Sequence, residues 1–260
     1  MAYEFAIYEK RPDKHLAVIT MNRPEVMNAL HLPATLELTA IWDDFAADPD
    51  LWVAILTGAG ERAFSAGNDL KYRPAPDDPP RPPTGWGGLL TRFDLYKPTI
   101  AAINGWAMGG GLEIALACDI IVAAETARLG MPEVRVGGAP SESGGAHRLP
   151  RQIPSRIAMA MLLTGRPIAA AEAYRVGLVN EVVPADQLMA AAERWAAAIA
   201  EASPLAVRAV KEAALSGADL PLETAMAVDY PGIDRLRESI DREEGRRAFR
   251  EKREPQWSGR

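Results

Sequence analysis

Short apolar runs rich in β-branched residues recur along the first two thirds of the chain, and each is about as long as one β-strand. Between them lie longer segments whose apolar residues follow helical spacing. The runs are 16–21, 52–58, 98–105, 118–125 and 177–183, and the clearest helical segments are 32–47, 109–118 and 155–165, the last closed by Gly165. This alternation predicts an α/β fold.

Helical patterns replace the strands from about residue 186 onward. Ser203 and Pro204 stand where an N-cap and a first-turn proline would begin a helix. Between residues 234 and 253, basic and acidic side chains are spaced so that opposite charges can pair on a helix, which is typical of a solvated helical face. We therefore expect a core over 1–195 and a helical C-terminal segment over 196–260.

The segment 73–83 is rich in proline, with six prolines among its eleven residues. Proline at this density excludes both a helix interior and a central strand, so the segment is predicted to be a loop. A stiff linker between domains is the alternative interpretation. Because strand patterns continue on both sides without a change of composition, a loop over a functional site is favoured.

The composition and charge of the chain exclude several classes of protein. The chain has 260 residues, of which 48% are hydrophobic and 25% charged, and this is ordinary for a globular protein that needs no disulfides. Cys118 is the single cysteine, which excludes an intrachain disulfide and fits a cytoplasmic protein. The net charge of −6 argues against nucleic acid and anionic membranes as partners. We find no secretory leader pattern and no long uncharged apolar stretch.

Two glycine-bearing turns, at 63–71 and 103–115, each follow a predicted strand and precede a helical pattern. Such turns direct unpaired backbone N–H groups outward, where they can hold an anion or a developing oxyanion. Neither turn carries a nucleotide-binding signature, because the triplet at 109–111 lacks the lysine and hydroxyl of a phosphate loop. A glycine triplet can also serve only as a tight packing contact.

Glu113 and Glu133 are candidate catalytic residues. Glu113 lies one turn into an apolar helical segment, and Glu133 lies between a glycine turn and a short apolar run. A buried carboxylate is costly, so each is either paired structurally or retained for chemistry. Two such carboxylates indicate acid–base catalysis.

The sequence resembles the crotonase superfamily, which comprises the enoyl-CoA hydratases and isomerases. The resemblance runs over essentially the whole chain and is carried by the segments 22–30, 63–71, 97–119, 131–137, 163–184 and 244–257. It implies a right-handed spiral of ββα turns, followed by a C-terminal helical segment that assembles homotrimers or homohexamers. It also implies an acyl-CoA thioester as the substrate and no separate cofactor, because coenzyme A is part of that substrate.

The resemblance also assigns roles to individual residues. It implies an oxyanion hole formed by the backbone N–H groups of Asn68 and Gly110, and the two glutamates of a hydratase at Glu113 and Glu133. Phe249 and Lys252 would reach the CoA of a neighbouring subunit, although an amphipathic helix alone would produce the same spacing. Binding of the CoA ester is further assigned to Val26, Met27, Ala66, Asp69, Leu70, Lys71 and Trp86.

Three departures from the family pattern bear on the site. The segment 137–148 is one residue longer than the usual hydratase motif and contains Glu142, a possible extra acid whose alternative is a solvent-facing loop residue. Glu25 stands where a lysine is frequent near the CoA phosphates. His147 has no second ligand nearby in the sequence, so we expect no metal site.

Hydration of an enoyl-CoA, or dehydration of a 3-hydroxyacyl-CoA, is the leading function because both glutamates are present. Isomerisation of an enoyl-CoA and hydrolysis of an acyl-CoA are alternatives within the superfamily. A non-catalytic, RNA-binding protein of the same fold is a further alternative, against which the acidic net charge and the two glutamates argue.

Overall fold

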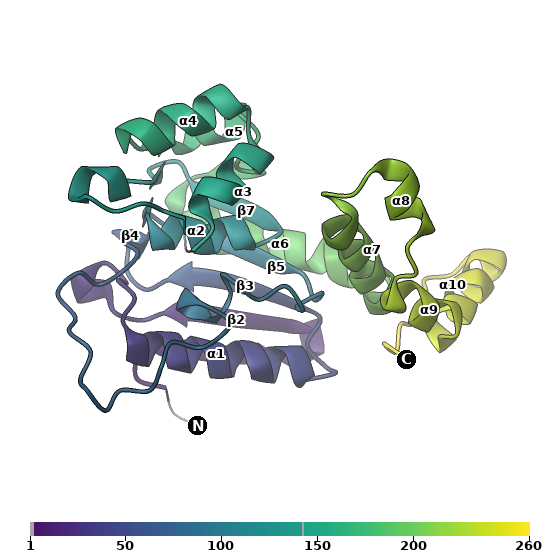
Figure 1. Cartoon of the computed structure of the whole chain (residues 1–260). Coiled ribbons are helices and arrows are strands. Elements are labelled where there is room, and N and C mark those ends of the chain that lie inside the picture. The colour runs from purple at the N-terminus through teal and green to yellow at the C-terminus, as the bar shows by residue number, and fades with distance from the viewer. Residues whose placement is uncertain (1–2, 142) are drawn as a thin grey trace.

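The computed structural model describes residues 3–141 and 143–260, and its centre is a six-stranded sheet with the order β1-β2-β3-β5-β7-β10 (Figure 1). All neighbouring strands run parallel except β1, which pairs antiparallel with β2. The strands are β1 (Ala6–Arg11), β2 (Leu16–Met21), β3 (Val53–Gly58), β5 (Thr99–Ile103), β7 (Ile120–Ala124) and β10 (Glu181–Val183).

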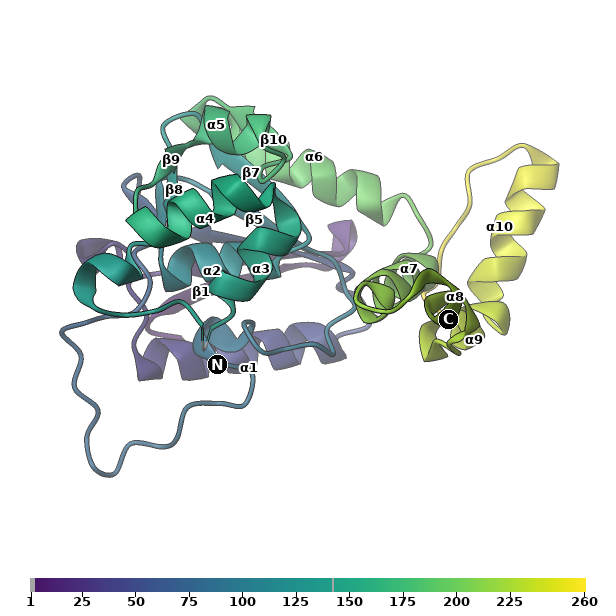
Figure 2. The same ribbon diagram turned by 45° about the horizontal axis from the view of Figure 1, so that its top comes forward.

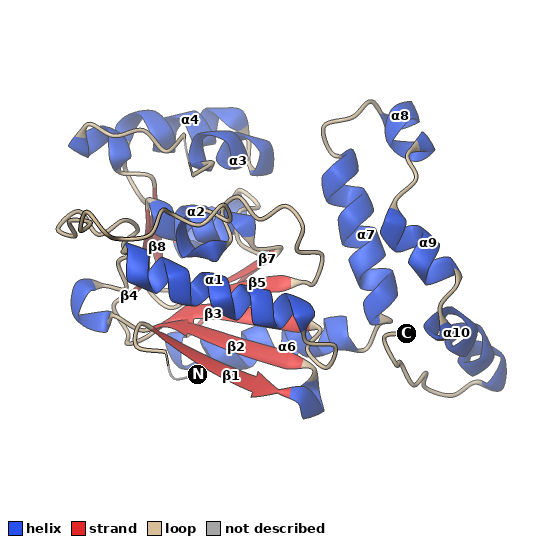
Figure 3. Ribbon diagram, turned by 60° about the horizontal axis from the view of Figure 1, so that its bottom comes forward, coloured by secondary structure: helices blue, strands red, loops and turns tan. Residues whose placement is uncertain are grey.

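Helices cover both faces of this sheet at β2, β3, β5 and β7, which explains why these strands read as continuous apolar runs. Alternate residues of these four strands enter two different cores. Ile19, Leu56 and Ala101 face the side covered by α1 (Leu32–Ala47). Their neighbours, such as Ile55 and Ile100, pack with α6 (Leu188–Ala200) on the opposite side (Figure 3).

A second sheet has the order β4-β6-β8-β9, and three of its short strands, β4, β6 and β8, are the next strands in the chain after long ones. The chain passes from β3 to β4, from β5 to β6 and from β7 to β8, so the two sheets advance together as a spiral. The remaining elements of this region are β4 (Ala63–Ser65), β6 (Trp106–Met108), α2 (Gly110–Ala117), β8 (Arg128–Gly130), α3 (Gly145–Gln152), α4 (Ser155–Thr164), β9 (Ile168–Ala169) and α5 (Ala170–Arg175). The predicted spiral α/β core is confirmed.

The predicted strand over 177–183 is wrong in its first half, because only Glu181–Val183 pairs with β7. The amide groups of Leu178 and Val179 instead donate to the carbonyl of Ala173 at the end of α5, at 2.8 and 3.3 Å. Both side chains are buried, so their apolar character reflects packing beneath a helix end and not sheet pairing.

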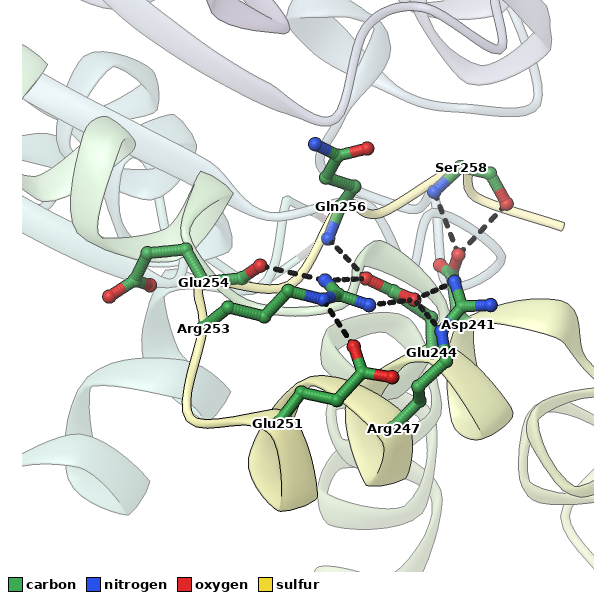
Figure 4. A network of polar contacts seen from close by, with 8 residues as sticks. All are labelled: Asp241, Glu244, Arg247, Glu251, Arg253, Glu254, Gln256 and Ser258. Atoms are coloured by element: carbon green, nitrogen blue, oxygen red, sulfur yellow. Dashed lines mark hydrogen bonds and ion pairs between the residues drawn. The ribbon is translucent and has the colours of Figure 1, made fainter.

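The C-terminal helices form a lobe beside the sheet, connected to it by α6 (Figures 1 and 2). The predicted boundary at residue 195 falls inside α6, whose buried side continues to Ala196. Ser203 caps the next helix by accepting the amide of Ala206, as predicted. The lobe consists of α7 (Pro204–Gly217), α8 (Leu222–Ala227), α9 (Pro231–Arg237) and α10 (Ile240–Glu251), and polar contacts hold the last residues against α10 (Figure 4).

The proline-rich segment 73–83 is a loop without helix or strand, as predicted, and it projects from the body (Figure 2). It returns at a short 3₁₀ turn, Trp86–Gly88, that lies against α1. Within residues 3–141 and 143–260, every helix is too short or too polar to traverse a lipid bilayer.

Candidate active site

The two glycine turns singled out in the sequence meet in space. Gly67 has a φ of +83°, and a Cβ added there would lie 2.7 Å from the amide nitrogen of Gly110 and 2.7 Å from the carbonyl oxygen of Met108. Only glycine therefore allows this approach without displacing the backbone. The contact brings the amides of Asn68 and Gly110 to one edge of the same cavity.

Both amides are directed away from intramolecular partners. The amide of Leu30 donates to the carbonyl of Gly67 at 2.7 Å, and the carbonyl of Leu30 accepts the amide of Asp69 at 2.8 Å. Because Asn68 lies between these two residues, its own N–H points away from Leu30. Gly110 is the first residue of α2, where N–H groups have no partner within the helix. Two such donors can hold a negatively charged oxygen.

Glu113 lies in the first turn of α2 and is 3% exposed. Its Oε1 accepts the backbone N–H of Gly145, at the start of α3, at 2.8 Å. Burial raises the pKa of Glu113 from 4.5 to about 7, and the nearby charge of Glu133 acts in the same direction. The carboxyl group can therefore both accept and donate a proton near neutral pH.

Glu133 begins a 3₁₀ turn, Glu133–Val136, that follows β8. A Cβ on Gly109 would lie 2.8 Å from its Oε1, so the glycine triplet makes room for this carboxylate as well. Burial raises the pKa of Glu133. Its Oε2 is buried and has no hydrogen-bond partner among the described residues, which leaves it available to a ligand.

These groups surround a cavity of about 410 Å³. Its wall combines the two candidate acids and the two amides with apolar side chains and two serines. Seven of the predicted residues line it, namely Ala66, Asn68, Leu70, Trp86, Gly110, Glu113 and Glu133. The others that line it are Leu30, Gly109, Pro132, Val136, Ala139, Pro140, Ser141 and Ser143.

The other predicted residues that the structure describes lie outside the cavity wall. Asp69 pairs with Arg23 at 3.0 Å, and Lys71 is exposed. Val26 ends a 3₁₀ turn, Pro24–Val26, and Met27 caps that turn in a left-handed conformation. Phe249 and Lys252 lie on the C-terminal lobe and are exposed, and Glu142 lies outside the described residues.

Sequence reasoning did not identify Gly145 and Arg148 as parts of the site. Gly145 holds Glu113, and the guanidinium of Arg148 donates to the carbonyls of Leu90 and Ser143, which ties the segment before α3 to the turn that carries Trp86. The unusual spacing of glycines over 137–148 was the available signal. The described residues contain no group of three or more His, Cys, Asp or Glu side chains that could hold a metal ion.

The chain matches a known family and named relatives over almost its whole length. The family model for enoyl-CoA hydratase/isomerase matches residues 11–260. The chain is 46% identical to (E)-benzylidenesuccinyl-CoA hydratase of Thauera aromatica, over 94% of this chain and 96% of the relative, and 42% identical to carnitinyl-CoA dehydratase of Citrobacter koseri, over 93% and 94%.

Solved structures of enoyl-CoA hydratases also match this chain over nearly its whole length. Enoyl-CoA hydratase from Mycobacterium tuberculosis superposes with a TM-score of 0.88 at 35% identity, covering 98% of this chain and 99% of that one. Enoyl-CoA hydratase from Bacillus anthracis superposes with a TM-score of 0.88 at 36% identity, covering 99% and 100%. Because the family model and both kinds of relative extend over nearly the whole chain, this protein belongs to the enoyl-CoA hydratase/isomerase family.

Proposed function

We propose that this enzyme adds water reversibly across the C2–C3 bond of a 2-enoyl-CoA thioester. The observation that carries the proposal is the position of two carboxyl groups with raised pKa values, the buried Glu113 and the half-buried Glu133, in the wall of a cavity that also presents the amides of Asn68 and Gly110. The relatives named as hydratases and dehydratases support the same reaction class.

The two amides act on the thioester carbonyl. When water attacks C3, negative charge moves through C2 onto the thioester oxygen and forms an enolate. The N–H groups of Asn68 and Gly110 would donate to this oxygen, and loss of one such donor typically costs roughly 3 kcal/mol of transition-state stabilisation. Because the donors are fixed by the close approach of Gly67 to α2, they need no rearrangement during the reaction.

The two glutamates transfer the protons of the reaction. In the hydration direction, one carboxylate accepts a proton from the attacking water and the other carboxyl group donates a proton to C2. In dehydration the two roles are reversed. A pKa of about 7 at Glu113 suits either role, because both protonation states are populated near neutral pH. The pair shares one reaction centre, so its titration belongs to both residues together.

The test is turnover of a short 2-enoyl-CoA, followed by loss of its ultraviolet absorbance and by identification of the product. A 3-hydroxyacyl-CoA supports the proposal. Free CoA thiol as the main product would indicate a hydrolase, and a 3-enoyl-CoA would indicate an isomerase. Glu113→Gln and Glu133→Gln should each lower kcat by roughly 10²–10⁴ while leaving CoA-ester binding largely intact.

We further propose that the active unit is a homotrimer or homohexamer in the cytoplasm and uses no cofactor beyond the CoA of its substrate. The C-terminal lobe exposes several large apolar side chains, among them Leu222, Met226, Ile240 and Phe249, which is costly for a monomer. Phe249 and Lys252 would then complete the CoA site of a neighbouring chain. The single cysteine, Cys118, supports a reducing compartment.

Mixing inactive variants tests this shared site. A chain carrying Glu113→Gln has an intact lobe, and a chain carrying Phe249→Ala and Lys252→Ala has intact glutamates. If sites are shared, reassembly of the two chains after dissociation restores some activity at low substrate concentration, because some interfaces then combine intact parts. No gain over the separate variants, or a fully active monomer, would show that each site is complete within one chain.

A further inference from the structure

A second cavity, of about 280 Å³, adjoins the catalytic one. Trp86 and Ser143 line both cavities, so they form the boundary between them. The second cavity is further lined by Pro82, Pro83, Leu90 and Thr91, and by one cationic side chain, Arg81. It thus extends the catalytic cavity past Trp86, away from the two glutamates.

The framework of this second cavity is well fixed. The carbonyl of Gly87, which follows Trp86, accepts the indole N–H of Trp42 at 3.0 Å, and a Cβ on Gly87 would lie 2.5 Å from Ile114. On the other side, Thr91 donates through its amide to Thr84 at 3.0 Å and through its hydroxyl to Pro83 at 2.5 Å. The boundary at Trp86 is therefore held by α1 and α2, and Thr91 fixes the end of the long loop beside it.

Arg81 is the charged group at this cavity. Its guanidinium lies 5.8 Å from the centre of the Trp86 ring, in a cation–π arrangement. It forms no ion pair with a described residue. Asp78, three residues earlier in the chain, accepts the hydroxyl of Tyr72 and the amide of Ala75 on its Oδ2. Pro82 and Pro83 follow directly and restrict the backbone that carries Arg81.

We propose that the second cavity is a specificity subsite for acyl groups that carry a carboxylate at their far end, with Arg81 as its receptor. This inference rests on the proposed hydratase function. The apolar rims formed by Trp86, Leu90 and the prolines suit the methylene groups of such an acyl chain. A guanidinium binds a carboxylate with two parallel hydrogen bonds, which neither a methyl group nor an amide can reproduce.

The test compares a chain-length series of saturated ω-carboxyacyl-CoA esters with their ω-carboxamide counterparts, which have the same shape without the charge. Because saturated esters cannot be hydrated, their dissociation constants report on the subsite alone. We expect the carboxylate to bind about tenfold more tightly than the carboxamide at the best chain length. Arg81→Met should abolish this preference, and Arg81→Lys should restore only part of it.

Arg73→Met is the matched control, because Arg73 lies on the same loop and, among the described residues, donates only to the carbonyls of Leu70 and Tyr72. It should keep the preference. Equal binding of carboxylate and carboxamide by the wild-type protein, or an Arg81→Met variant that weakens both esters equally, would overturn the inference. Hydration assays on the corresponding unsaturated esters are read separately. If none of them is hydrated while the Arg81-dependent preference persists, the hydratase function fails and the subsite stands.

Discussion

The backbone N–H of Gly145 donates to Oε1 of Glu113 at 2.8 Å. The first turn of α3 thereby holds the side chain of Glu113, a candidate acid on α2, in place. One carboxylate oxygen is thus occupied, and the other, Oε2, faces the catalytic cavity beside Gly110, where an added Cβ would lie 3.8 Å away. The positive end of α3 also favours the charged form of Glu113 and partly offsets its burial. The reactivity of Glu113 therefore depends on a residue 32 positions away in the chain.

Gly145→Ala should lower kcat by roughly 10–100-fold with little change in global stability. A methyl group at this position would lie 2.8 Å from Oε1 of Glu113 and 3.0 Å from its Cγ, so the carboxylate must move. Steady-state kinetics on a 2-enoyl-CoA measure the effect. Gly138→Ala is the control, because its Cβ meets only ordinary contacts with Glu133 at 3.5 Å or more. Equal activity of the two variants would show that the contact with Gly145 does not position Glu113.

Gly67→Ala should reduce kcat/KM by more than about 100-fold, because it separates the amides of Asn68 and Gly110. The added Cβ would lie 2.7 Å from the nitrogen of Gly110, and the φ of +83° is itself unfavourable for alanine. Gly60→Ala controls for that backbone strain, since Gly60 has a φ of +75° but its Cβ would only approach Pro24, at 3.3 Å. Activity retained in Gly67→Ala would remove these two amides from the oxyanion hole.

Removal of the charge at Glu113 should stabilise the protein, and the gain should grow with pH. The folded protein holds a proton on Glu113 up to about pH 7, whereas the unfolded chain releases it near 4.5. Between these values the native state binds more protons, so the free energy of unfolding falls as pH rises. Glu113→Gln has no proton to lose at this position. The free energy of unfolding of the variant, relative to that of the wild-type protein, should therefore be higher at pH 8 than at pH 4.5 by up to about 3 kcal/mol. Urea unfolding at both pH values decides the matter, and a difference independent of pH would contradict the burial argument.

The sequence predicted the helices of the core closely because their local signals are strong. The segment 32–47 coincides with α1, and Gly165 ends α4 in a left-handed conformation as a helix stop should. The segment 177–180 was misread because burial beneath a helix end and burial in a sheet select the same apolar residues.

Within the site, motifs identified the residues that supply charge and amides, since their chemistry restricts residue type. The other residues that line the catalytic cavity were harder to predict. Pro132, Ala139 and Ser143 enter the cavity through tertiary packing that no local pattern encodes. Gly145 was missed for a related reason, because its role is a backbone hydrogen bond whose partner lies on another helix. The role of Arg81 likewise depends on the return of the loop to Trp86.

The C-terminal residues are held by two carboxylates of α10, Glu244 and Asp241 (Figure 4). Glu244, whose side chain is 4% exposed, accepts from Arg253 at 2.6 Å and from the amide of Gln256 at 2.8 Å, and also pairs with Arg247. Asp241 accepts the amide of Ser258 at 2.7 Å. Together they fold residues 253–260 back along α10.

Glu244→Gln should release this segment without unfolding α10, because the amide can keep one contact but loses the ion pairs. Hydrogen exchange at Gln256 should accelerate, whereas Glu243→Gln, which removes only the exposed pair with Arg246, should leave it unchanged. Arg253 holds the pKa of Glu244 far below its usual 4.5, so this contribution is present above about pH 4.5 and is lost as pH falls further. The protection of the Gln256 amide, measured relative to its intrinsic exchange rate at each pH, should thus fall in acid in the wild-type protein and change less in Glu244→Gln. Wild-type protection that is the same at pH 7 and in acid would show that Glu244 does not hold the segment.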